Sequence, residues 1–538
     1  MDRLKSQWET CKSETSDGDC QSQPGTSQSE IIQLAKKQRS DNCEKGSVGG
    51  RENSGSSGHL DSFVVRTGQD KKKELDRQIA KAVYATNCSF RAIENKEVQK
   101  AIEMLRPGYL PPSRFQLSST LLNEIFEEEK SNCFNKLSGQ SVCMSLDGWS
   151  NIHNEPIICV VLTAEDGNSV LLESIDTSGH PHTADYLAEL AINSINKCKN
   201  EYNCKVTSIV TDNASNMVSM KKKITESSNY PIITYGCSAH LLSLLSKDLE
   251  ASQIKEHIVH IVKYFRNTHL PNAWYKEKGG KKLVLPQDVR WNTLSDCLEI
   301  YVNEWPKLLL ICEEHKDQID PVIFKKVSDI CIKRMAEDFL QLLKPISIAL
   351  DAMQQKGAFL SQAVYIWKKL LAIFDSFEFE EERSLRQYQL FKNRYVQALT
   401  PFHFLAYILD PTINKEEYPL LAEEKRDALH IVSKYFADTG LLPLLIKLEA
   451  KSDPFHKTLF SEEIIKNVTA VQWWRSQEDV SEVKQVLPIV ISVLCACASS
   501  ADIERMFSTY GFVHSDIRNR LGNDKAAKLV FLFKHYNT

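Results

Sequence analysis

Apolar and polar positions change their spacing several times along the chain, most often between residues 139 and about 250. Alternating or β-branched apolar runs are typical of strands, whereas apolar residues at i, i+3 and i+4 are typical of helices. Strands are predicted at 140–146, 156–163, 169–176, 206–212 and 231–236. Helices are predicted near 184–200, 214–226 and 238–250. This stretch is therefore predicted to be an α/β unit.

The connections between these strands indicate how they pair. Short turns, such as 165–168, join the first three strands and favour an antiparallel meander. A helix leads into the fourth strand, which implies a right-handed parallel crossover. Three antiparallel strands followed by strand–helix–strand is the order of a ribonuclease H-like core, and we expect a core of that class.

Helical spacing prevails on both sides of this unit. From about 61 to 131 the apolar residues recur at helical spacing, and three prolines (Pro107, Pro111 and Pro112) interrupt the pattern. From about 255 to 480 nearly all of the chain is predicted to be helical, and a dense apolar run follows at Leu487–Leu494. The expected fold class is therefore α/β plus all-α.

The composition is that of a soluble globular protein with two or three domains. Of its 538 residues, 42% are hydrophobic and 25% charged. The net charge of −4 means that DNA binding would need locally concentrated basic residues. The 15 cysteines form no CxxC pair, and the sequence shows no signal peptide and no apolar run of about 18 residues. We expect reduced thiols, and neither secretion nor membrane insertion.

Residues 1–58 are rich in Ser, Gly, Gln, Asp and Glu and poor in apolar residues, so we expect a disordered tail. Lys36–Arg39 within it is a candidate nuclear-import cluster, with an ordinary surface cluster as the alternative. The tail's cysteines, Cys11, Cys20 and Cys43, lack the paired histidines of a zinc finger.

Two acidic residues follow predicted strands in the same way. The first predicted strand ends on Asp147, where Gly148 allows a sharp turn, and the fourth ends on Asp212. Strands of one sheet could place these carboxylates side by side, where they repel each other unless a cation lies between them. A hard divalent ion such as Mg²⁺ meets that need. The alternative for Asp147 is that it only begins a turn.

Five short motifs follow one another along the chain: Leu146–Trp149, Thr211–Met217, Cys237–His240, Arg290–Thr293 and Ser499–Ser508. In this order they resemble the hAT superfamily of DNA transposases. The tail Arg518–Leu521 is similar to the end of that family's C-terminal dimerisation region. The resemblance covers roughly residues 75–538.

The resemblance implies a ribonuclease H-like core interrupted by a large helical insertion. The expected divisions are a disordered N-terminal tail (1–58), a helical DNA-binding or assembly region (59–135), the first part of the core (136–255), the helical insertion (256–482), and the core return with the dimerisation region (483–538).

By the same resemblance, Asp147, Asp212 and Glu504 are the catalytic, metal-holding acids. They would hold Mg²⁺ or Mn²⁺ for DNA strand cleavage and transfer. Without the resemblance, Glu504 could equally be an acid favoured in the first turn of a helix.

The resemblance also suggests DNA contacts. Trp291 would stack on a flipped base and Arg290 would contact phosphate, although Trp291 could instead pack in a helical core. Lys281 and Lys282 lie in a basic loop that could follow a phosphate backbone.

Cys237 and His240 have the spacing of a metal-ligand pair, but no second pair lies nearby in the sequence. We therefore do not expect zinc, and we assign both residues a structural or DNA-positioning role.

The expected partners are double-stranded DNA and a second copy of the chain, as a homodimer or higher oligomer, in the nucleus and without a membrane. The C-terminal apolar residues Phe507, Leu529 and Phe533, with Val493, Leu494, Val530 and Leu532, are the candidates for dimerisation. The alternative is that they pack only on the protein's own core.

Three functions are compatible with the sequence. The first is a metal-dependent transposase, because all three acids are present. The second is a host-adopted, non-catalytic DNA-binding and dimerising regulator of transcription or chromatin, because no Cys/His set of the BED type, with which many members begin, is present. The third, an unrelated ribonuclease H-like nuclease acting on RNA, does not account for the motifs at Arg290–Thr293 and the C-terminus.

Overall fold

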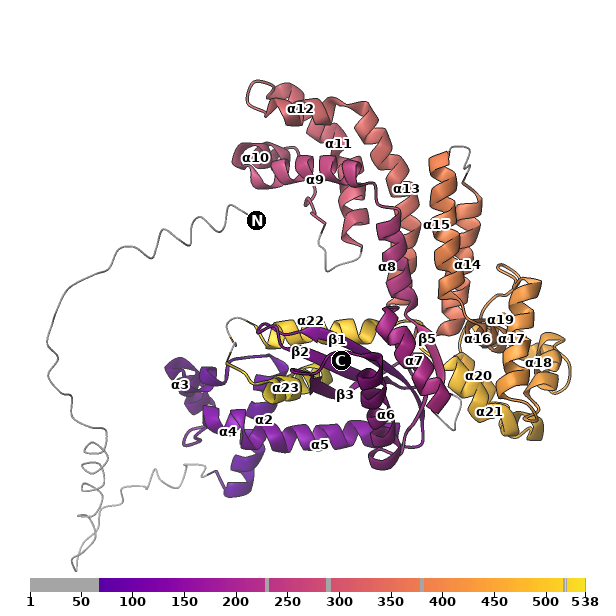
Figure 1. The fold of residues 1–538 in the computed structure, drawn as a ribbon. Helices are drawn as coiled ribbons and strands as arrows, with labels where there is room; N and C mark the ends of the chain where they lie inside the picture. The colour runs from indigo at the N-terminus through magenta and orange to yellow at the C-terminus, as the bar shows by residue number, and fades with distance from the viewer. Residues whose placement is uncertain are drawn as a thin grey trace, which may run out of the picture. The chain divides into compact units, whose positions relative to one another are not determined.

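The computed structural model describes residues 67–227, 232–286, 292–377, 382–515, 518 and 520–537. The expected disordered tail and its basic cluster Lys36–Arg39 lie outside the described residues. Figure 1 shows the order of the elements along the chain.

A five-stranded mixed sheet lies in the N-terminal half of the described chain (Figure 1). Its strands are β1 (Ser141–Ser150), β2 (Pro156–Thr163), β3 (Ser169–Asp176), β4 (Lys205–Thr211) and β5 (Ile233–Gly236). The strand order is β3-β2-β1-β4-β5. β1 pairs antiparallel with β2, and β2 with β3, while β4 runs parallel to β1 and β5 parallel to β4. The predicted meander and parallel crossover are therefore confirmed.

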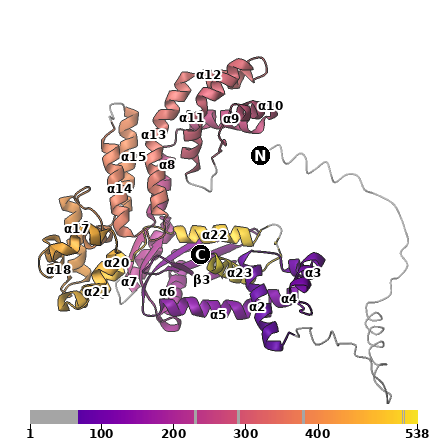
Figure 2. The ribbon, with the colours of Figure 1, turned by 180° about the vertical axis from the view of Figure 1, so that it is seen from behind.

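The sheet is buried on both faces, which is why its strands are nearly continuous apolar runs. Val142, Met144 and Leu146 of β1 pack with α6 (Ala184–Glu201) and α7 (Ser215–Ser227). Side chains on the opposite face of β2 pack with α22 (Ala501–Val513) and α23 (Asn523–Tyr536). The C-terminus of the chain thus completes the layer that covers one face of the sheet (Figure 2).

β1 does not end at Asp147, so that prediction is wrong. The antiparallel pairing with β2 continues through Asp147–Cys159 and Gly148–Ile158 to Ser150–Pro156. Because β2 still supplies backbone partners, the backbone at Gly148 stays extended and makes no turn. Asp147 therefore lies inside a strand that is paired on its β2 side.

The N-terminal helices pack beside the C-terminal ones. They are α2 (Gln69–Ala85), η2 (Phe90–Glu94), α3 (Lys96–Leu105), α4 (Arg114–Ser118) and α5 (Thr120–Leu137). α2, α4 and α5 share a hydrophobic cluster with α22 and α23. Several cations of α2 form ion pairs, including Arg77 with Glu128 and Lys81 with Glu129. These pairs favour a structural role for the basic side of α2.

Between 255 and 480 the described chain is mainly helical, as the spacing predicts, with loops that include 281–286 and 410–421. Its elements are α9 (Ser252–Asn267), α10 (His269–Glu277), α11 (Thr293–Glu314), α12 (Pro321–Ser328), α13 (Ile330–Met353), α14 (Leu360–Asp375), α15 (Glu382–Ala398), α16 (Pro401–Leu409), α17 (Ala422–Tyr435), α18 (Leu441–Glu449), η3 (Lys457–Phe460), α19 (Glu462–Ile465) and α20 (Ala470–Arg475). α8 (Ser238–Asp248) leads into them from the sheet, and α21 (Ser481–Leu494), which contains the dense apolar run, leads back. None of the helices described is long and apolar enough to cross a membrane.

The turn between α13 and α14 joins this helical segment to the sheet. Lys356 Nζ donates to Asn168 Oδ1 at 2.6 Å, in the turn between β2 and β3. The backbones of Gly167 and Gly357 approach so closely that a Cβ on Gly167 would lie 3.0 Å from the Cα of Gly357. Both glycines have φ of +76°. Hydrogen bonds from Ala498 N to Ala358 O (2.8 Å) and Leu360 N to Ala496 O (2.9 Å) fix the same turn to the chain preceding α22.

We predict that Gly167→Ala destabilises the protein by about 1–2 kcal/mol more than Gly108→Ala. Gly108 has nearly the same backbone conformation, with φ of +78°, but nothing lies within 4 Å of its Cβ position. The difference between the two substitutions therefore isolates the contact with Gly357. Urea unfolding, monitored by circular dichroism, measures this difference in the free energy of unfolding. Equal losses of stability in the two variants would show that the turn at Gly167 does not contact the turn at Gly357.

Candidate active site

Asp147 and Asp212 are brought together by the pairing of β1 with β4. The parallel register runs as far as Ser145 and Val210. Two more residues in the same register place Asp147 level with Asp212, and adjacent strands lie about 4.8 Å apart. The side chains of paired residues point to the same face of a sheet, so the two carboxylates share one face.

Asp212 lies directly after β4, and its side chain is fixed by the start of α7. Its Oδ1 accepts a hydrogen bond from the backbone N–H of Ala214 at 3.1 Å. The buried Lys221 donates to the carbonyl oxygens of Asp212 (3.3 Å) and Tyr235 (3.0 Å), which joins the carboxyl ends of β4 and β5. Burial lowers the pKa of Lys221 to about 8.

Lys221 is not among the residues singled out from the sequence, and this role was missed. The signal was its position: Lys221 falls on the same face of α7 as the buried residues Met217, Met220 and Ile224. A lysine at an apolar position of an amphipathic helix needs acceptors inside the protein.

Glu504 lies near Asp147 because α22 lies over β1. Trp149, two residues after Asp147 and on the same face of the strand, stacks on Phe507 with ring centroids 5.7 Å apart. It also contacts Tyr510 at 5.4 Å between ring centroids. Phe507 lies one turn beyond Glu504 in the helix, so this stacking carries Glu504 toward Asp147. The sequence offered Trp149 only as part of a motif, without this role.

The chain before α22 is fixed by Cys237, the N-cap residue of α8. Its Sγ accepts hydrogen bonds from the backbone N–H groups of His240 and Ser500, both at 3.4 Å. Ser238 N donates to Ala498 O at 3.0 Å. Cys237 is fully buried and half-buried His240 has its pKa lowered, chiefly by burial. These contacts are of the structural kind expected for the pair.

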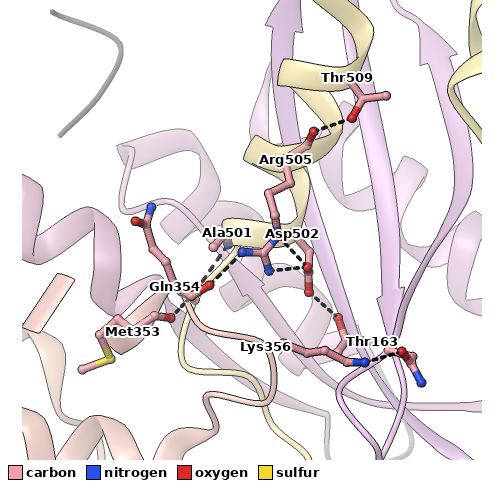
Figure 3. Close-up of polar contacts among 10 residues, drawn as sticks. Thr163, Met353, Gln354, Lys356, Ala501, Asp502, Arg505 and Thr509 are labelled. Carbon is pink, nitrogen blue, oxygen red and sulfur yellow. Dashed lines mark hydrogen bonds and ion pairs between the residues drawn. The ribbon is translucent and has the colours of Figure 1, made fainter. Parts of the chain in front are cut away.

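The first turn of α22 is also joined to the helical segment (Figure 3). Arg505 donates to the carboxylate of Asp502 and, at 2.7 Å, to the carbonyl oxygen of Gln354 at the end of α13. Thr163 at the end of β2 donates to Asp502 at 3.5 Å. Ser500 is the N-cap residue of α22, but its side chain makes no capping hydrogen bond. The side chain of Ser499 bonds the helix start instead: its Oγ accepts from Ala501 N (3.4 Å) and donates to Met353 O (2.8 Å).

The three acids interact electrostatically, with Asp147 coupled to both of the others. Burial, and then the charge of Asp212, raise the pKa of Asp147 to about 7. Burial, and then the charge of Asp147, raise the pKa of Glu504 to about 7, although neighbouring Arg505 opposes the rise. The structure therefore places Asp147, in β1, near enough to Asp212 and to Glu504 for their charges to interact.

Two family models match the chain in the segments that carry these acids. A domain of unknown function, DUF659, matches residues 112–265, which include Asp147 and Asp212. The hAT family C-terminal dimerisation region matches residues 455–536, which include Glu504. The two matches support a hAT transposase-like protein. A search of the curated proteins gave no match.

The donor chemistry of the three acids fits a hard divalent ion, which prefers carboxylate oxygens. Among the residues described, however, no group of three or more His, Cys, Asp or Glu side chains is arranged to hold a metal ion. The site is thus a set of interacting carboxylates and not a preformed cage.

The expected DNA contacts are only partly described. Arg290 and Trp291 lie outside the described residues. Lys281 and Lys282 are exposed, in a loop fixed by a hydrogen bond from Tyr275 OH to the carbonyl oxygen of Lys281 at 2.8 Å. Their exposure leaves both ammonium groups open to solvent.

The predicted dimerisation residues differ in exposure. Leu529 is only 3% exposed and packs in the chain's own core, as do Val493, Leu494, Val530 and Leu532. Phe507 and Phe533 are partly buried, and Phe507 faces Trp149. The apolar C-terminal residues thus serve mainly the protomer's own core, and a partner surface must be sought among more exposed side chains.

We predict that Asp147→Asn stabilises the metal-free protein at pH 8. A carboxyl whose folded-state pKa is raised binds more protons when folded than when unfolded between about pH 4 and 7, so stability falls as pH rises through that window. The amide removes that loss and should raise the free energy of unfolding at pH 8 by about 1–3 kcal/mol.

Thermal unfolding in EDTA at pH 5 and pH 8 measures this effect. Glu124→Gln, at an exposed position of α5, is the control and should leave the pH dependence unchanged. A wild-type protein as stable at pH 8 as at pH 5, with no gain in Asp147→Asn, would show that the carboxylates do not repel one another.

Proposed function

We propose that this protein is a hAT-type transposase, or a transposase-derived nuclear DNA-binding protein, that cleaves and transfers DNA strands with Asp147, Asp212 and Glu504. The observation that carries the proposal is the parallel register of β1 and β4, which places Asp147 level with Asp212 on the face covered by α22, the helix that contains Glu504. Two of the acids lie in the DUF659 match and the third in the dimerisation region. The strand order β3-β2-β1-β4-β5, resumed by α22 after a long helical segment, supports a ribonuclease H-like core with a helical insertion.

The three carboxylates would hold Mg²⁺ or Mn²⁺, which when bound stabilises charge on the attacking and leaving oxygens of phosphoryl transfer. Asp147 is the central acid because it interacts with both partners. β1 and the stacking of Trp149 on Phe507 restrict how far Asp147 and Glu504 can move apart. No residue need form a covalent intermediate, since water and then a DNA 3′-hydroxyl can serve as nucleophiles.

The partners that we propose are double-stranded DNA and a second copy of the chain. Lys281 and Lys282 would contact phosphate, and Arg290 and Trp291 would contact phosphate and an unstacked base. The dimerisation region supports a homodimer. These partners imply a nuclear protein.

One observation favours a second function. The described acids are not arranged as a metal-binding group of three. A host-adopted regulator that keeps the fold, binds DNA and dimerises without cleaving it would have no need of such an arrangement.

A cleavage assay separates the two functions. The purified protein is incubated with Mg²⁺ or Mn²⁺ and labelled DNA carrying the terminal repeats that flank its gene, beside Asp147→Ala and Asp212→Ala. We expect metal-dependent nicks or hairpins from wild type, and at least a hundredfold less product from either variant with DNA binding unchanged. Glu124→Gln is the matched control and should cleave as wild type does.

Cleavage that survives in Asp147→Ala would contradict the assignment of the acids. DNA binding by the wild type without cleavage, under either metal, would favour the regulator.

A further inference from the structure

Large apolar side chains are exposed in and after α3. Met104 is 76% exposed, Leu105 86%, Leu110 76% and Phe115 67%. They lie within twelve consecutive residues, at the end of α3, in the turn that follows and at the start of α4. We call these four side chains, together with Val98 (38% exposed), the α3–α4 surface. Isolated exposed apolar side chains need no explanation, but a group of this size does.

The pattern of α3 shows that its exposed face is built for packing. Val98, Ala101, Ile102 and Leu105 follow the i, i+3, i+4, i+7 spacing of an amphipathic helix. α3 nevertheless contains no buried residue, and only Ile102 packs, in part, against the core. A ten-residue helix has little stability of its own. Packing of its apolar stripe against another surface would therefore stabilise α3.

The α3–α4 surface adjoins the dimerisation region. Asn87, just before η2, donates to the carbonyl oxygen of Phe512 at 3.0 Å. Arg518 donates to the carbonyl oxygen of Asn87 at 2.7 Å, and its guanidinium lies 5.9 Å from the ring centroid of Phe90 in η2. η2 in turn packs against both α3 and α4. Phe512 and Arg518 lie in the segment that matches the hAT dimerisation region.

Phe512, whose carbonyl oxygen accepts the hydrogen bond from Asn87, adds an exposed apolar side chain on α22. Its side chain is 56% exposed, with its ring centroid 5.4 Å from that of Phe533 on α23. The α3–α4 surface alone exposes on the order of 600 Å² of apolar side chain, at the upper end of the largest patch on a typical monomer. With Phe512 it approaches the roughly 800 Å² per partner of a stable dimer interface.

The chemistry of the surface favours a protein partner over DNA. Contacts with a phosphate backbone need concentrated cations. The exposed ends of these five side chains are instead apolar, and a nearby cation, Arg114, lies over the ring of Phe115 with its Cζ 4.9 Å from the centroid. An apolar centre with charged residues at its edge is the composition of a dimer interface.

We propose that the α3–α4 surface, together with Phe512, binds a second copy of this chain. The contact is isologous, with the same surface on both copies, as in most twofold dimers. The proposed dimer interface thus includes the helices at residues 96–118 as well as the matched C-terminal region. The proposal does not depend on the acids or on any cleavage activity.

Sedimentation velocity of the full chain over a range of concentrations tests this proposal. The variants are Met104→Glu/Leu105→Glu and Leu110→Glu/Phe115→Glu, which bring charges into the proposed contact. Because all four positions are exposed, the substitutions should leave the circular dichroism spectrum and the unfolding midpoint unchanged. We expect a dimeric wild type, and a dimer dissociation constant raised at least tenfold in each double variant.

Ile446→Glu and Val396→Glu are matched controls, since these side chains are 63% and 74% exposed elsewhere in the chain. Both controls should remain dimeric. A monomeric wild type would overturn the proposal. Double variants that dimerise as tightly as the controls would also overturn it. This holds even if Phe512→Glu disrupts the dimer, because the contact would then involve α22 and not the α3–α4 surface.

Discussion

The repulsion among three carboxylates is the constraint on which the rest of this structure depends. Asp147 interacts with both Asp212 and Glu504, and the charges raise the pKa values of Asp147 and Glu504 beyond the effect of burial. Such an arrangement costs stability and persists only if the surrounding packing fixes it. Parallel pairing of β1 with β4 positions the two aspartates, and the stacking of Trp149 on Phe507 brings Glu504 toward Asp147. The second contact joins residues far apart in the sequence.

The chain makes a long excursion between Asp212 and Glu504, and its return is fixed at several points. Cys237 accepts a hydrogen bond from Ser500, and Arg505 joins Asp502 to the end of α13. The helical segment between them is thus joined to the turn that carries Glu504 and is not merely attached at its two ends. A displacement of α13 would reach the acid through Arg505, so the geometry of the site and the position of this helix are physically linked.

Periodicity predicted most of the fold, because the sheet is buried on both faces and its helices are amphipathic. The bounds of β2 and β3 agree with the structure, and those of β4 differ by one residue at each end. β1 was predicted too short because Asp147 and Gly148 look like a turn locally, whereas pairing with β2 extends the strand. The resemblance suggested the acids, but the contacts that position them depend on residues distant in sequence. Lys221 could have been found from its apolar position in α7; the stacking of Trp149 on Phe507 could not, since nothing local records it.

Manganese binding measured by isothermal titration calorimetry tests most directly whether the acids form one site. Wild type is compared with Glu504→Gln, Asp212→Asn and the control Glu124→Gln. If all three acids share one ion site, both amide substitutions at the site lower the affinity for Mn²⁺ at least tenfold and the control leaves it unchanged. Affinity that is unchanged in Glu504→Gln would contradict the account, because α22 would then contribute nothing to the site on which the proposed chemistry depends.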